Sequence, residues 1–244
     1  MSTEMPRAVR DELAPQGRLR AGLNYGNFLL IRREPSGPRG IVPDLAAELA
    51  RRAGVPLEFV GYDSPGQVAD AAASGAWDIA FIGAEPARAA EIAFSAAYLE
   101  IEATYLVPAG SPIRTIEDVD RPGVSIATSA RSAYDLYLTR TLKHATLERA
   151  QGLDASFALF VGRKLDVLSG LRPRLIEEVV KLPGARVLEG RFTAVQQAIG
   201  TPKARQAAAQ YLRAFAEEVK ASGFVAGLIA RHGVRGVNVA PPSP

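Results

Sequence analysis

Short apolar runs alternate with amphipathic segments along the first part of the chain. Three runs have the composition of strands buried on both faces of a parallel sheet: Leu19–Leu23, Leu57–Val60 and Asp78–Ile82. Pro43–Ala53 repeats leucine and alanine at helical spacing before Gly54, which predicts an amphipathic helix that ends at the glycine. Val68–Ser74 predicts a shorter helix. This alternation of strand and helix is typical of a right-handed parallel sheet.

A long apolar stretch then leads to a second series of strands and helices. Ala96–Val107 predicts a strand that leaves one lobe and enters another, because a segment rich in proline and glycine follows it. Phe192–Ile199 predicts the strand that returns to the first lobe. We therefore expect one lobe of residues 1–107 plus 192–244 and a second lobe of residues 108–191. The elements expected within the second lobe are a turn at Thr115–Val119, strands at Gly123–Ala127, Leu165–Ser169 and Ala185–Leu188, and a helix at Leu153–Gly162.

The ends and connections of the first lobe carry weaker signals. The first dozen residues are expected to fray, and Arg32–Gly40 is expected to form a polar turn. Thr201 and Pro202 predict the cap of a helix that extends to Ser222, and Phe224–His232 predicts a final amphipathic helix.

Length and composition are those of a globular protein. The chain has 244 residues, of which 48% are hydrophobic and 23% charged, enough for two lobes of ordinary size. No uninterrupted apolar run approaches the length of a membrane span. The N-terminal segment carries charge but no apolar core of a secretory signal, so we expect either a cytoplasmic protein or one whose leader has been removed.

The residue types present exclude several kinds of chemistry. The chain has no cysteine, which excludes disulfides, thiolate catalysis and thiolate metal sites. Its two histidines, His144 and His232, lie in different segments, so we expect no metal ion and no cofactor. The net charge of +3 is small and dispersed, which does not favour nucleic acid as a partner.

The most informative stretch follows the strand predicted at Asp78–Ile82. Gly83 ends that strand, and Pro86 after Glu85 predicts a short helix over Ala87–Ile92 whose first turn holds Arg88. Ligands of open α/β sheets bind beyond the carboxyl ends of the strands, and a guanidinium matches a carboxylate with two parallel hydrogen bonds. Arg88 is therefore a candidate clamp for a small anion. The alternative is a solvated arginine on a surface helix.

The segment from Trp77 to Val107 resembles the first-lobe core of the bacterial extracellular solute-binding proteins of family 3, which serve polar amino acid ABC transporters. In that family an arginine, a few variable residues and an apolar-Phe-Ser triplet lead into the hinge strand, as Arg88 and 93–95 do here. The resemblance extends over 19–232. It implies an α/β, two-lobed, periplasmic-binding-protein-like type II fold with two hinge-crossing strands and a ligand cleft between the lobes, and it implies that Arg88 binds the ligand's carboxylate.

Two further segments match ligand-contacting loops of that family. Asn24, Asn27 and Phe28 lie in the loop after the first strand and are expected to line the cleft, although asparagine and glycine are also ordinary turn residues. In the second lobe, Thr128–Tyr134 follows a strand and opens a helix to about Leu142, and a helix N-terminus accepts anions. The resemblance implies that Ser129 and Ala130 bind the same carboxylate there, with Arg131 as an extra donor. The alternative is that Ser129 is only a helix cap.

One position departs from the family pattern. Amino acid-binding members usually place an aspartate, which neutralises the ligand's ammonium, a few residues after a pair such as Leu165-Asp166. Leu171 stands at that position here. Because a buried ammonium needs a compensating charge, either the ligand has no amine or Glu85 supplies the negative charge. Glu85 is favoured slightly, although it can equally pair with Arg88 and only orient it.

These observations favour a monomeric solute-binding protein that captures a small carboxylate or amino acid for an ABC-type permease, without catalysis. The resemblance places such a protein in the periplasm. Two alternatives stay open. Cyclohexadienyl dehydratases resemble the same family, and in such an enzyme Glu85 is the candidate general acid, with a raised pKa. A cytoplasmic ligand-sensing module is the other alternative, although no pair of DNA-binding helices precedes Leu19.

Overall fold

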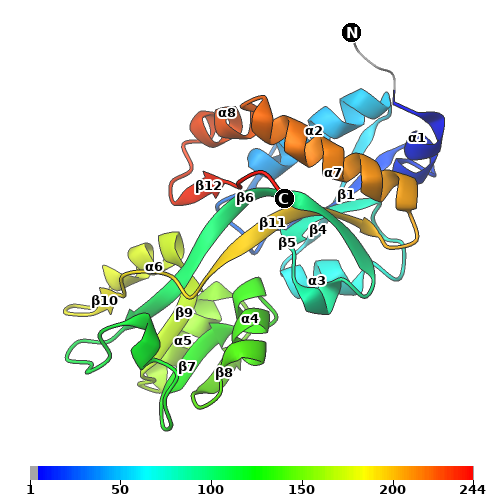
Figure 1. Cartoon of the computed structure of the whole chain (residues 1–244). Helices are drawn as coiled ribbons and strands as arrows, with labels where there is room; N and C mark the ends of the chain where they lie inside the picture. The colour runs from blue at the N-terminus through cyan, green and yellow to red at the C-terminus, as the bar shows by residue number, and fades with distance from the viewer. Residues whose placement is uncertain (1–4, 244) are drawn as a thin grey trace. The chain divides into compact units, whose positions relative to one another are not determined.

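A computed structural model describes residues 5–243 of the chain and divides it into two compact units. Unit 1 contains the residues up to Glu100 and from Gln196 onward, and unit 2 contains Ile101–Val195. Two strands contribute to both units: β6 (Ile92–Val107) and β11 (Thr193–Pro202) (Figure 1). The chain therefore passes from one unit to the other twice, each time within a continuous strand.

The sheet of unit 1 is built from the apolar runs that predicted strands. Its order is β4-β1-β5-β11-β6. The first three strands are β4 (Leu57–Tyr62), β1 (Leu19–Asn24) and β5 (Ile79–Gly83). β1 pairs in parallel with both β4 and β5, whereas β11 runs antiparallel to β5. All five residues of β5 are buried, as expected of a strand covered on both faces.

Helices cover this sheet with the faces that their sequences predict. In α2 (Ile41–Ala53), Leu45 and Leu49 are fully buried, and Gly54 ends the helix in the left-handed conformation with a φ of 65°. The other helices of unit 1 are α1 (Arg7–Leu13), α3 (Pro65–Asp70), α7 (Gln206–Ala221) and α8 (Phe224–Arg231). A short strand, β12 (Val237–Val239), pairs with β6.

Unit 2 repeats the α/β plan on a smaller sheet. Its strand order is β6-β9-β7-β8, in which β7 runs parallel to both β8 and β9, and β6 runs antiparallel to β9. The strands are β7 (Ser125–Ser129), β8 (Thr146–Ala150), β9 (Val167–Leu171) and β10 (Arg186–Val187), the last antiparallel to β6. The helices are α4 (Ala133–Thr141), α5 (Leu153–Gly162) and α6 (Arg172–Val179), with the 3-10 turn η2 at Ile116–Asp118.

The short helix predicted at Ala87–Ile92 was wrong. The chain forms only a 3-10 turn, η1 (Pro86–Arg88), and β6 begins at Ile92 instead of Ala96. Two contacts explain the longer strand. The Ile92 side chain is buried in a cluster with Trp77 and Ile82, and Ser95 Oγ accepts a hydrogen bond of 3.0 Å from the Ile199 amide. Pairing with β11 therefore stabilises the extended conformation from Ile92 onward more than a local helical turn would.

Other differences concern short or polar elements. The predicted polar turn contains a small hairpin, β2 (Arg32–Glu34) and β3 (Gly37–Arg39). Thr201 and Pro202 end β11 instead of capping a helix, and the Thr201 hydroxyl donates a hydrogen bond of 3.0 Å to the Asp78 carbonyl. The first dozen residues, expected to fray, include most of α1, although residues 1–4 lie outside the described part. Strands β8 and β12 and helix α6 were not predicted. Among residues 5–243, no helix has both the length and the apolar composition needed to cross a membrane.

Candidate functional site

The candidate residues of unit 1 lie on two loops that leave the same edge of its sheet. Asn24 ends β1, and η1 follows the end of β5. These two strands are parallel neighbours, with Leu23 opposite Phe81. The loop of residues 24–28 and the turn of residues 84–88 therefore begin side by side at the carboxyl edge, where open α/β sheets bind ligands.

Arg88 is held inside this edge. Only 6% of the residue is exposed, and its Nη1 donates a hydrogen bond of 2.6 Å to the carbonyl of Gly83, the last residue of β5. This bond fixes the guanidinium against the end of the strand. The alternative of a solvated arginine on a surface helix is therefore wrong, whereas a role in binding a carboxylate stays a prediction.

Glu85 lies on the same turn and is also largely buried, with 9% of the residue exposed. It is the N-cap residue that precedes the 3-10 turn, and its carbonyl accepts a hydrogen bond of 2.9 Å from the Arg88 amide. Glu85 and Arg88 are thus three positions apart on one turn, and each is largely buried. Such a pair interacts more strongly there than it would in water.

The two asparagines of the first loop differ in what their side chains do. Asn24 Oδ1 accepts a hydrogen bond of 3.1 Å from the Gly26 amide, so this side chain stabilises its own turn. Asn27 Oδ1 is buried and has no hydrogen-bond partner within residues 5–243. Because a buried polar atom without a partner is costly, Asn27 is the better candidate for a ligand contact. Phe28 is half-buried beside it in the sequence.

The candidate residues of unit 2 lie at the carboxyl end of β7. Ser129 is the last residue of that strand and is 7% exposed. The cap of α4 is Ser132, whose hydroxyl accepts a hydrogen bond of 3.0 Å from the Asp135 amide. The alternative that Ser129 caps the helix is therefore wrong, whereas the helix itself begins within the predicted segment and ends at Thr141.

Protein groups already occupy two of the backbone donors near Ser129. The Ala130 amide donates to the Ala150 carbonyl at 2.8 Å. The Arg131 amide donates to Asp135 Oδ2 at 2.7 Å, and Arg131 has a left-handed φ of 58°. The Asp135 carboxylate thus stands at the start of α4, where an external anion was expected to bind. A ligand contact in this turn depends on side chains more than on these two amides.

Tyr134 ends the segment that was expected to bind a carboxylate, and its sequence pattern predicted no role for it. It is buried, and burial raises its pKa to about 12, while hydrogen bonds with the Ser132 and Ser129 side chains act in the opposite direction. Its place on the first turn of α4 is the sequence signal that identifies it. The hydroxyl of Thr128 is buried without a partner in the described chain, on the opposite face of the strand from Ser129.

Leu171 lies at this same carboxyl edge. It is the last residue of β9, which is parallel to β7 with Leu168 opposite Ala127. The next residue, Arg172, donates from Nε to Glu102 Oε2 at 2.7 Å and is thereby engaged in an ion pair. The position that carries an acid in the resembled family therefore offers only an apolar side chain here.

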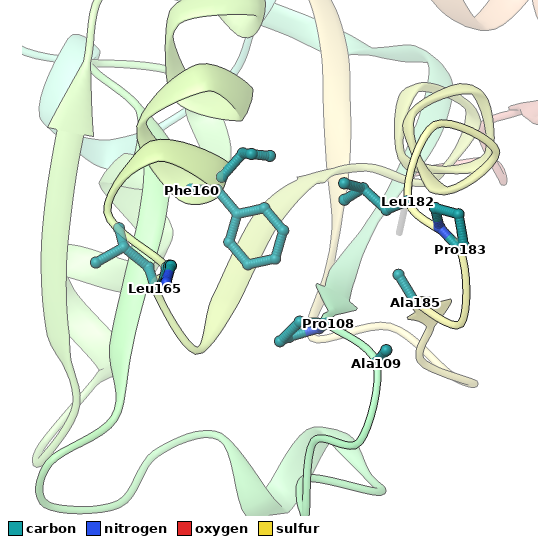
Figure 2. Close-up of a pocket in the computed structure, with 9 residues that line it drawn as sticks. Pro108, Ala109, Phe160, Leu165, Leu182, Pro183 and Ala185 are labelled. Carbon is teal, nitrogen blue, oxygen red and sulfur yellow. The ribbon is translucent and has the colours of Figure 1, made fainter.

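Two pockets lie elsewhere, each within a single unit. One in unit 1 has a volume of about 280 Å³ and polar walls that include Arg39 and His232. One in unit 2 has a volume of about 360 Å³ and a mostly apolar lining that includes Phe160 (Figure 2). None of the eight residues predicted to bind the ligand lines either pocket. Within the described chain, no group of three acidic or histidine residues is placed to hold a metal ion.

Comparison with known proteins gives a family and a fold. A sequence model of the bacterial extracellular solute-binding proteins, family 3, matches residues 24–234. A search of curated proteins gives no match.

Several solved structures are similar along nearly their whole length. A mutant of ArgBP from T. maritima has 23% sequence identity and a TM-score of 0.73, with 92% of this chain and 99% of that chain covered. A putative ABC transporter binding component from Wolinella succinogenes DSM 1740, complexed with lysine, has 21% identity and a TM-score of 0.73, with coverage of 88% and 95%. The ancestral amino acid-binding protein AncCDT-1, a precursor of cyclohexadienyl dehydratase, has 21% identity and a TM-score of 0.74, with coverage of 91% and 97%. At these identities the likeness shows the shared α/β fold.

Proposed function

The chain belongs to family 3 of the bacterial extracellular solute-binding proteins, and from this premise we propose that its solute is an amino acid, which it delivers to an ABC transporter. The observation that carries the proposal is the pair of buried polar groups at the carboxyl edge of unit 1. Arg88 is a cation suited to a carboxylate, and Asn27 offers an acceptor that no described protein group uses. An amino acid carries both complementary groups.

Arg88 accounts for the carboxylate. Its Nη1 is anchored on the Gly83 carbonyl, which holds the guanidinium plane in place before a ligand arrives. Hydrogen bonds to charged groups contribute about 1.5–3 kcal/mol each, and a preorganised fork loses little side-chain entropy when it forms two of them. From unit 2, we propose that the hydroxyl of Ser129, which lies at the carboxyl end of β7, donates to the same carboxylate.

The ammonium is assigned to Glu85 and Asn27. Leu171 provides no counter-charge, so the negative charge has to come from another residue. Glu85 is buried on the turn that carries Arg88, and Asn27 Oδ1 adds a neutral acceptor from the neighbouring loop. This arrangement supports an amino acid over a carboxylate without an amine. The names of the structurally similar proteins, which refer to amino acid or lysine binding, agree with it.

A thermal-shift screen of L-amino acids and their des-amino analogues tests the proposal. A ligand that binds only the folded protein raises the melting temperature, and we expect a rise for one or a few amino acids and none for their analogues. Arg88→Ala should abolish the rise. Arg213→Ala removes an exposed arginine from α7 of the same unit and should leave the rise unchanged. If the analogues stabilise the protein as well as the amino acids do, the assignment of the ammonium is wrong. If Arg88→Ala binds normally, the whole site is wrong.

A catalytic role is the second candidate, because one similar structure is a precursor of cyclohexadienyl dehydratase. On that scaffold Glu85 would act as a general acid. We propose binding without catalysis, and therefore expect no turnover of prephenate or arogenate. Turnover that Glu85→Gln abolishes would reverse this choice.

We also propose that the protein works outside the cytoplasmic membrane as a monomer that contacts a permease. The family description, which is extracellular, supports this location. Fractionation of cells that express the complete gene tests it, and recovery of the protein only with the cytoplasm would contradict it.

A further inference from the structure

The apolar pocket of unit 2 lies at the edge of the sheet opposite to Ser129. Pro108 follows the end of β6, and Leu165 precedes the start of β9, which runs antiparallel to β6. The pocket is therefore at the amino ends of β9 and β7. Ser129 and Leu171 lie at their carboxyl ends. A molecule in this pocket does not compete for the predicted amino acid site.

The pocket opens onto the hydrophobic core of unit 2. Phe160 and Leu165 belong to a buried cluster and are 2% and 6% exposed, and Leu182 and Ala185 pack against the same cluster. Figure 2 shows the Phe160 ring between Leu165 on one side and Leu182 on the other, with Pro108 and Ala109 below it in this view. A volume of about 360 Å³ and a lining of aliphatic and aromatic groups are typical of sites for small molecules.

A single cationic side chain accompanies these apolar walls. Lys164 lines the pocket in the turn after α5, is exposed, and has no ion pair within residues 5–243. The neighbouring cations are engaged elsewhere: Arg163 pairs with Glu148, and Lys181 pairs with Glu178 at 2.7 Å. Because the lysine ammonium sits on a flexible stem, it can follow an anionic group at the mouth of the pocket.

We propose that this pocket binds a small amphiphile with an apolar body and one carboxylate, such as a medium-chain fatty acid. The apolar body fills the space around Phe160 and releases water from its walls. The carboxylate stays at the surface and pairs with Lys164. This charge complementarity favours an apolar acid over a neutral apolar molecule or the side chain of another protein.

Octanoate is the probe that tests the proposal. Binding is measured by isothermal titration calorimetry on the full chain, and its place is identified by amide chemical-shift changes. We expect one site, with changes at residues 160–165 and 182–185. Each methylene added between butanoate and octanoate should tighten binding roughly fourfold, because each buries further apolar surface. An affinity that does not change with chain length would overturn the proposal.

Two variants separate the apolar walls from the charge. Ala109 is exposed, so Ala109→Phe can fill the pocket without disturbing the core, and it should abolish octanoate binding. Lys164→Gln should weaken octanoate roughly two- to fivefold, the size of an exposed ion pair, and leave octanol unchanged. Lys143→Gln removes an exposed lysine that does not line the pocket and should have no effect.

The outcomes also separate this pocket from the amino acid site. Amino acid binding should survive both Ala109→Phe and Lys164→Gln, which shows in addition that these variants are folded. Octanoate binding that is unaffected by Ala109→Phe, or equally weakened by Lys143→Gln, would overturn the proposal. Self-association of the chain that Ala109→Phe abolishes in analytical ultracentrifugation would identify the pocket as a protein contact and would also overturn it.

Discussion

Replacing Asn27 with alanine is expected to weaken amino acid binding while costing little stability. The backbone of Asn27 keeps its own hydrogen bonds, since its amide donates to the Asn24 carbonyl and its carbonyl accepts from the amides of Leu30 and Ile31. Its side-chain Oδ1 has no partner in the described chain, so truncation breaks no hydrogen bond of Oδ1. It instead removes a buried unsatisfied group, whose desolvation costs about 1–3 kcal/mol.

Asn24→Ala is the matched control for stability. Both residues are asparagines of the same loop, and each is 7% exposed. Asn24 Oδ1 accepts from the Gly26 amide, so its truncation leaves that amide without its partner. Asn24→Ala should therefore destabilise the protein more than Asn27→Ala does, by roughly 1–3 kcal/mol. Urea unfolding followed by circular dichroism measures the difference.

Binding should show the reverse order. A hydrogen bond to an ammonium contributes about 1.5–3 kcal/mol, so Asn27→Ala should weaken the amino acid found in the screen roughly 10- to 150-fold. Its des-amino analogue lacks the donor, and its affinity should stay unchanged by the substitution. Calorimetric titration of both ligands gives the comparison. Equal losses for the two ligands, or an unchanged amino acid affinity, would refute the reasoning about Asn27.

Three further substitutions follow from the structure. Arg88→Lys keeps the charge but loses the two-pronged geometry, so amino acid affinity should fall at least roughly tenfold in calorimetry; full retention would contradict a bidentate contact. Asp78 is fully buried and accepts hydrogen bonds of 2.8 Å from both Arg20 and Arg205. Asp78→Asn should therefore lower the free energy of unfolding, measured by urea unfolding, by roughly 3 kcal/mol. A loss below about 1 kcal/mol would show that these two ion pairs contribute little to stability. Burial raises the pKa of Tyr134 to about 12, above its value near 10 in the unfolded chain. The folded state then binds more protons between these pH values, so the free energy of unfolding should fall as the pH rises from about 10 to 12. In urea titrations at several pH values, Tyr134→Phe should make this fall less steep, by an amount that corresponds to at most one bound proton. An unchanged dependence of the free energy of unfolding on pH would contradict the burial argument.

The order of strands and helices was predictable because burial on both faces of a sheet leaves continuous apolar runs in the sequence. β1, β4 and β5 were found within a few residues of their bounds, and α5 was found at Leu153–Gly162. The elements that were missed are short or half-exposed, like β8, where no residue is fully buried and no apolar run marks the strand. Tertiary pairing also overrode a local signal: β6 begins at Ile92, where a helix was predicted, and Ser95 in that segment accepts a hydrogen bond from Ile199 of β11.

The candidate site shows the same division. The residue types and their order were enough to name Arg88, Glu85 and Ser129 as candidates, and to notice that Leu171 stands where the resembled family has an acid. Nothing local distinguishes Asn24 from Asn27, or Ser129 from Ser132 as the helix cap. The tertiary structure decided these cases, because whether a polar atom is satisfied depends on which groups from other strands and turns surround it. The sequence by itself determined the fold and the kinds of side chain at the edges of the sheets. Only the folded chain determined which of those side chains have a hydrogen-bond partner within the protein, because burial and pairing are set by neighbours that are distant in the sequence.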